Sequence, residues 1–213
     1  MVSLPNYDPN LLDEQFDELV EDEDAPLLNR VTQGLYPPGR LLLPLLIGTA
    51  AESGLIGLDE PVGTTLPADD CINPPAEPLT WDAVLLGRCS TPVTQIGDQL
   101  GRGGLAQLFA AAGLTVTPTL AINTEVAPVL AVEDPLLAAQ GQEGLSVTPL
   151  QIGQLWWALG EGGTLPSIRL LRDEVISNAA GEKGRLAALV PDAVLTEFVV
   201  PVLSGPEGMT NGW

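Results

Sequence analysis

The sequence has no histidine and little positive charge, and both shortages narrow the functions that it can have. Lysine and arginine together number 8, against 28 aspartate and glutamate residues, so the net charge is -20. A surface this acidic repels polyanions, so we do not expect DNA or RNA as partners. Without histidine, the chain lacks the commonest general base and metal ligand. We therefore expect no histidine-based catalytic triad and no zinc site. No other feature of the sequence leads us to expect a cofactor.

Long apolar runs are also missing. The longest, over residues 41–51, is far shorter than the roughly 20 residues that cross a bilayer, and it predicts a buried helix instead. The first residues lack the basic segment and the apolar stretch of a signal peptide. We therefore expect no membrane span within this chain, so that any anchor would belong to a longer parent protein.

Cysteine is scarce, with Cys71 and Cys89 as the two representatives. The pair can form one disulfide if the domain lies outside the cytoplasm, where such bonds persist. Two unpaired, buried thiols are an equally good interpretation. The sequence leaves both open.

What the sequence does contain is enough apolar residues for a core, in a mostly helical pattern. With 213 residues and 45% hydrophobic content, one domain is expected. We predict helices over residues 11–21 with Asn10 as the N-cap, 41–53 ending at Gly54, 81–87 after a Thr80 cap, 91–101, 105–112, and 149–160 after a Thr148 capping box. Residues 57–78 are rich in proline, glycine and aspartate, which predicts an irregular connection.

Two other segments have weaker patterns. The acidic run 21–24 is interpreted as the solvated end of the first helix rather than a calcium loop, because no glycine provides the turn that such a loop needs. Beyond Pro166, apolar stretches at 168–176 and 186–190 predict a hairpin. Residues 191–200 then favour a helix, and 203–213 a strand or turn.

Four separated segments resemble the transpeptidase domain of penicillin-binding proteins. The strongest is APLLNRVTQGLYPPG over residues 25–39, which resembles the approach to the nucleophile. LPNYDPN at 4–10 looks like the segment after the second strand of that domain. Residues 79–101 resemble the helices around the second motif, and 142–151 with the glycines of 160–163 resemble a conserved helix entry. The order and intervals of all four fit the family.

The resemblance implies three catalytic motifs, and the matching positions depart from all of them. Where the family has Ser-x-x-Lys, this chain has Arg40 and Leu43. Where the family has Ser-x-Asn, it has Arg88, Cys89 and Ser90. Lys-Thr-Gly is matched by Leu203, Ser204 and Gly205. The nucleophile, the base and the carboxylate anchor of acyl transfer are thus absent together, so no catalytic residue is expected.

Other residues at these positions leave two possibilities open. Cys89 or Ser90 can in principle attack a carbonyl, but neither has a histidine to activate it, and the sole lysine, Lys183, falls in a predicted turn. Arg40 and Arg88 can bind a carboxylate or phosphate in the vacated cleft, or can pair with acidic residues of this chain.

The resemblance also implies a fold that is only partly present. We expect a helix-rich α+β fold of the penicillin-binding-protein and β-lactamase type, with much of the central antiparallel sheet missing. Residues 1–213 form one partial domain: an N-terminal helix and approach (1–35), a helical part (36–165), and residual strands with a helix (166–213). The missing hairpin and last strands suggest a fragment of a longer protein.

The function implied is that of an inactive, extracytoplasmic relative of peptidoglycan D,D-transpeptidases that binds or scaffolds in cell-wall synthesis. Cell-wall synthesis proteins or peptidoglycan peptides are then the expected partners. One alternative is an active transpeptidase or carboxypeptidase with an unconventional nucleophile. Another is a truncated, decayed fragment without a function of its own.

Overall fold

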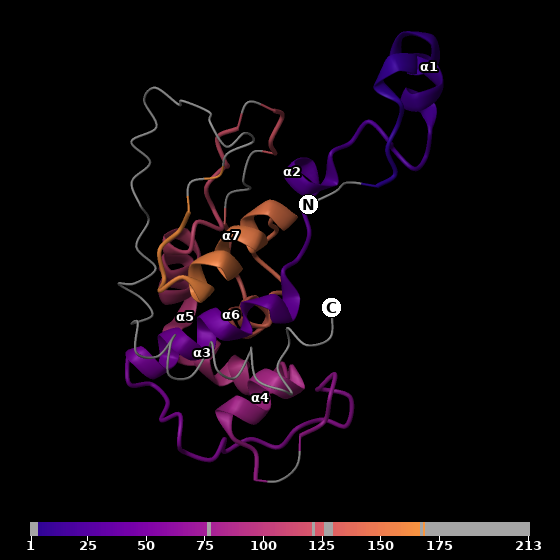
Figure 1. Ribbon diagram of the computed structural model, residues 1–213. Helices are drawn as coiled ribbons and strands as arrows, with labels where there is room; N and C mark the ends of the chain where they lie inside the picture. The colour runs from indigo at the N-terminus through magenta and orange to yellow at the C-terminus, as the bar shows by residue number, and fades with distance from the viewer. Residues whose placement is uncertain (1–3, 76–77, 121, 126–129, 167, 169–213) are drawn as a thin grey trace.

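The computed structural model describes residues 4–75, 78–120, 122–125, 130–166 and 168, and these residues are organised almost entirely by helices. In chain order they form the 3-10 turn η1 (Pro9–Leu11), α1 (Leu12–Glu21), α2 (Arg30–Gln33), the 3-10 turn η2 (Gly39–Leu42), α3 (Leu43–Glu52), α4 (Trp81–Gly87), α5 (Thr91–Ala111), α6 (Pro135–Ala139) and α7 (Pro149–Gly160). Figure 1 shows α3 to α7 gathered into one body, with α1 standing away from it.

The fold class is only partly as expected. Tyr36 and Val147 form an isolated antiparallel bridge through reciprocal N–H···O bonds of 2.9 Å, and no longer ladder is present among the described residues. The hairpin, helix and last strand predicted beyond Pro166 lie almost wholly outside the described ranges, and so does the third motif, Leu203 to Gly205. Those elements stay predictions.

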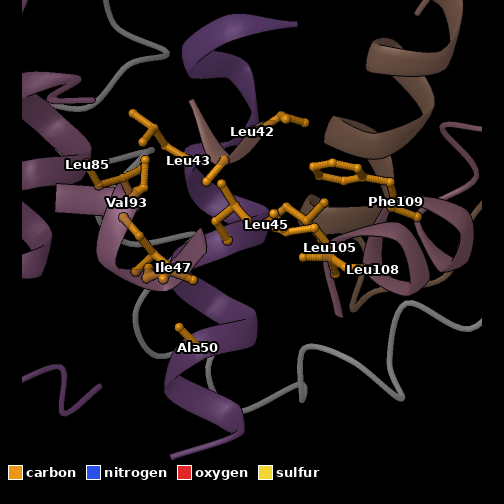
Figure 2. Close-up of a cluster of buried hydrophobic side chains, with 14 of the residues drawn as sticks. Leu42, Leu43, Leu45, Ile47, Ala50, Leu85, Val93, Leu105, Leu108 and Phe109 are labelled. Carbon is orange, nitrogen blue, oxygen red and sulfur yellow. The ribbon is translucent and has the colours of Figure 1, made fainter. Parts of the chain in front are cut away.

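Helix α3 is the centre of the core. Its sequence is apolar on every side, as expected of a helix surrounded by others, and its residues from Leu43 to Ala50 are all buried. Leu43 lies towards Leu85 of α4 and Val93 of α5, while the other side of α3 meets α5 residues around Leu105 (Figure 2). The predicted end of this helix at Gly54 is confirmed by its left-handed φ of +68°.

Helix α5 combines two predicted helices. The chain is helical from Thr91 to Ala111 except at Gly101, whose φ of 63° and ψ of -176° break the helix. The predicted stop at Gly101 and restart near Leu105 are therefore close to the observed geometry. On the first half of α5, a Cβ added to Gly97 would collide with the carbonyl oxygen of Pro135. Glycine is needed there because the short helix α6 packs directly against the backbone.

Several helix starts test the predicted caps. Thr148 and Gln151 form the predicted capping box, and the Gln151 amide also donates to the carbonyls of Leu114 (3.1 Å) and Val116 (2.9 Å). The prediction of Asn10 as an N-cap was wrong. Asp8 accepts from the Asn10 N–H instead, because Pro9 begins a 3-10 turn two residues before the predicted helix start.

Two further details differ from the sequence prediction. Thr80 occupies the N-cap position of α4 but its side chain makes no capping hydrogen bond. Helices α2 and α6 were not predicted, although Asn29 and Asp134-Pro135 are ordinary start signals for them. Within the described ranges, no helix combines the length and the apolar character needed to cross a membrane.

Candidate functional site

The first motif-equivalent position, Arg40, lies in η2 at the entry to α3. The turn before it is fixed by two glycines: Gly39 has a φ of +55°, and its N–H donates to the Gly141 carbonyl at 3.0 Å. A Cβ on Gly141 would come within 2.5 Å of the Gly39 nitrogen, so the two chain segments approach as closely as backbone allows. This contact sets the position from which the Arg40 side chain starts.

Arg40 is turned inward and is bound to another part of the chain. Its Nη2 donates to the main-chain carbonyl of Asp70 at 3.0 Å, and its buried Nε has no hydrogen-bond partner among the described residues. One turn later, Leu43 is 1% exposed and belongs to the hydrophobic core. Neither position offers a group that could attack or deprotonate a substrate.

The second motif-equivalent segment follows α4. Arg88 ends this helix in the left-handed region, with a φ of 54°, and its Nε is also buried without a described partner. Cys89 is fully buried and joined to Cys71 in a disulfide. The structure thus resolves the choice that the sequence left open, and Cys89 has no thiol with which to attack a carbonyl.

Ser90 lies at the start of α5, where its hydroxyl donates to the Asp70 carboxylate at 2.8 Å. The same carboxylate accepts the Thr91 N–H at 2.9 Å and the Thr91 hydroxyl at 2.7 Å. Asp70 therefore caps α5 from a loop 20 residues earlier in the chain. Asp70 brings Arg40 and Ser90 together, because its carbonyl binds one and its carboxylate the other.

The hydrogen bonds control the charge state of Asp70. Burial raises the pKa of this carboxyl, but the N–H and hydroxyl of Thr91 and the hydroxyl and N–H of Ser90 stabilise the anion, and the net pKa lies below its usual value. The partial positive charge at the start of α5 favours the anion further. A carboxylate with a lowered pKa is a weak base, so Asp70 is poorly suited to take a proton from Ser90.

Asp70 is the residue that the sequence analysis missed. It lies in the stretch whose composition predicts only an irregular connection, and it is 7% exposed. Its place directly before Cys71 was the available signal, since a disulfide to Cys89 would bring the neighbouring residue close to Ser90. The helix that Asp70 caps was predicted to start at Thr91, but with no cap beyond a first-turn proline.

The residues around Asp70 are poorly suited to hold a metal ion. Among the described residues, Asp70, Cys71 and Cys89 place possible ligand atoms within 4.8 Å of one another. Both sulfurs are joined in the disulfide, and the carboxylate already accepts hydrogen bonds from Ser90 and Thr91. The arrangement stabilises the loop rather than providing an open set of metal ligands.

Substitution of Asp70 tests the capping role. We expect Asp70→Asn to lower the free energy of unfolding by about 2 kcal/mol near neutral pH, because charge-assisted hydrogen bonds to Ser90 and Thr91 are lost. Chemical unfolding measures this loss. Asp69→Asn is the matched control, since its side chain is exposed and the same charge is removed one residue away.

The pH dependence of this effect has a definite sign. Because the pKa of Asp70 is lowered in the folded state, its stabilisation is complete above the ordinary value of 3.8 and disappears as the pH falls through the lower, folded-state value. The difference between wild type and Asp70→Asn should therefore be constant from about pH 5 to 8 and shrink below about pH 4. A difference that grows on acidification would contradict the assignment.

Comparison with known proteins finds sequence similarity to peptidoglycan D,D-transpeptidases. The chain is 27% identical over 187 residues to the peptidoglycan D,D-transpeptidase PbpA of Mycolicibacterium smegmatis, covering 76% of this chain and 38% of that protein. It is 43% identical over 61 residues to the peptidoglycan D,D-transpeptidase MrdA of Salmonella typhimurium, covering 26% of this chain and 10% of that protein. No family model matches.

The fold agrees with the sequence relatives. Penicillin-binding protein A from M. tuberculosis, in its penicillin G acyl-enzyme complex, superposes with a TM-score of 0.65 at 23% identity, over 77% of this chain and 43% of that one. In sequence and in fold, the chain therefore resembles the transpeptidase domain of penicillin-binding proteins. The transpeptidase-like domain spans less than half the length of PbpA, of MrdA and of the M. tuberculosis protein.

Proposed function

We propose that this transpeptidase-like domain is catalytically inactive and has a binding or scaffolding role in cell-wall synthesis, outside the cytoplasm. The observation that carries the proposal is the use of the motif-equivalent side chains inside the domain itself. Arg40 binds the Asp70 carbonyl, Leu43 is part of the core, and Ser90 donates to the Asp70 carboxylate. Arg40 and Leu43 thus offer neither a nucleophile nor a base, and Ser90 would have to give up its hydrogen bond to Asp70 to take part in acyl transfer.

Two lines of evidence support the cellular context. The relatives are named peptidoglycan D,D-transpeptidases, so the most economical role for this domain lies in the same process. The Cys71–Cys89 disulfide favours an oxidising compartment, where such bonds persist. Cell-wall synthesis proteins and peptidoglycan peptides are therefore the partners that we propose.

A fluorescent penicillin tests the loss of activity. We expect no covalent labelling of the folded domain, because no activated nucleophile is found at the described motif-equivalent positions. Penicillin-binding protein A from M. tuberculosis, which forms a penicillin G acyl-enzyme, is the positive control. The readout is in-gel fluorescence of native protein, with heat-denatured protein as the measure of background.

A stoichiometric label would contradict the proposal, and its location would identify the alternative. Loss of that label in Ser90→Ala would establish an unconventional serine nucleophile. The Ser90→Thr variant is the conservative control, because threonine keeps a hydroxyl that can donate to Asp70.

A further inference from the structure

Helix α1 carries an apolar stripe that the rest of the described structure leaves open. Leu12, Phe16, Leu19 and Val20 recur at helical spacing and share one side of the helix. Phe16 is 51% exposed and Val20 is 58% exposed, and no residue of α1 is buried. Amphipathic helices of globular proteins normally turn such a stripe to the core, so its exposure here requires an explanation.

The position of α1 explains why the core does not cover the stripe. Figure 1 shows α1 away from the body that α3 to α7 form, connected to it through residues 22–29 and α2. The helix packs mainly on η1, the turn directly before it. Its end is firmly defined, because Asp22 accepts the Asp24 N–H at 2.9 Å. The stripe therefore lies on a short, well-defined helix away from the hydrophobic core.

The charge around the stripe is of one sign. The opposite side of α1 and the turn after it carry Asp13, Glu14, Asp17, Glu18, Glu21, Asp22, Glu23 and Asp24, and the first basic residue of the sequence is Arg30. This distribution of charge limits which molecules can bind the apolar stripe. A second copy of a chain with net charge -20 would be repelled, and so would an anionic membrane surface.

We propose that α1 is a docking helix for another protein, which receives Phe16 and Val20 in an apolar groove bordered by lysine and arginine. The apolar stripe provides the affinity and the acidic side chains provide orientation and rate of association. Such a docking surface would serve the binding role proposed above. The docking proposal itself depends only on the observations on α1. The result of the penicillin-labelling experiment therefore does not decide whether α1 is a docking helix.

Site-specific photo-crosslinking tests this proposal on the full chain in the cells that encode it. Phe16 is replaced by the photoreactive analogue p-benzoylphenylalanine, which preserves an aromatic ring at the centre of the stripe. After irradiation we expect a heterologous protein adduct. Mass spectrometry of the adduct should place the crosslink in an apolar segment flanked by lysine or arginine.

A matched pair of valines controls for exposure. Val20→Ser should reduce the yield of the adduct about tenfold, since removing an anchor from the centre of an interface has an effect of this order. Val116→Ser should leave the yield unchanged, because Val116 is 59% exposed, close to the 58% of Val20, but lies after α5 and off the stripe. The yield should also fall as salt is raised, since charge contributes to association.

Thermal unfolding of the isolated chain separates docking from internal packing. Phe16→Ser and Val20→Ser should change the melting temperature no more than Val116→Ser does, because both side chains are exposed. A selective loss of stability in the α1 variants, or a crosslink within the same chain, would show that another segment covers the stripe. A dimer of this chain, a lipid adduct or the absence of any adduct would likewise overturn the proposal.

Discussion

Leu43→Lys, which restores the lysine of the family's first motif, is expected to destabilise the domain severely without activating it. Leu43 is 1% exposed and lies beside Leu85 and Val93 in the core. The substitution removes a buried apolar side chain and takes an amine out of water into the hydrophobic core. We expect a loss of at least about 4 kcal/mol, equivalent to roughly 8 to 16 °C in melting temperature for a chain of this size.

The pH dependence of Leu43→Lys distinguishes a buried amine from one that reaches water. A lysine held in the core has a lowered pKa, so the unfolded state binds more protons than the folded state and stability rises with pH. The melting temperature of the variant should therefore recover in part between about pH 7 and 10. Leu43→Met is the control, because its volume is similar and it adds no charge.

The Arg40→Ser, Leu43→Lys double variant extends this test to activity. It rebuilds the residues of Ser-x-x-Lys, but Ser90 remains bound to Asp70 and no asparagine stands at the second motif. We expect the double variant to remain unlabelled by fluorescent penicillin. A double variant that is as stable as wild type and acquires a label would show that the cleft is still assembled for catalysis.

Removal of the Cys71–Cys89 disulfide is the second change with a large expected effect. The bond closes a loop between residues 18 apart, for which the loss of loop-closure entropy corresponds to about 3 kcal/mol. It also holds Asp70 beside the start of α5. The Cys71→Ala, Cys89→Ala double variant should therefore melt roughly 6 to 12 °C below wild type.

Chemical reduction provides the complementary measurement. Reduction of wild type breaks the crosslink but preserves the volume of both side chains. The loss of stability due to the bond can therefore be separated from the loss due to the cavity that Cys89→Ala leaves. A reductant should have no effect on the double alanine variant. An unchanged melting temperature after complete reduction of wild type would contradict the stabilising role of the bond.

Much of the helical framework was predictable because its signals are local. The Thr148 capping box, the bounds of α4 and the stop at Gly101 all depend on residues within one turn of the feature. The missed helix α6 is only five residues long and owes its place to the close approach at Gly97. Such contacts between distant segments leave no periodic pattern in the sequence.

The candidate site was predictable in outline but not in its connections. The positions matching the family's motifs are inferred from the resemblance, and the loss of nucleophile and base is inferred from the residue types; both stay predictions. The role of Asp70 could not be predicted, because no sequence pattern indicates which groups will donate hydrogen bonds to an aspartate in an irregular loop. The exposure of the α1 stripe was equally hidden, since its sequence is that of a helix packed on a core.

The carboxylate of Asp70 can also be regarded as a ligand that the domain carries within its own chain. It occupies the donors at the start of α5 that a carboxylate from outside would otherwise use. Because it is tethered by the Cys71–Cys89 bond, its effective concentration there is at least in the millimolar range. A carboxylate from outside would have to displace this internal competitor to bind at the start of α5, so a peptide partner is expected to bind elsewhere on the domain.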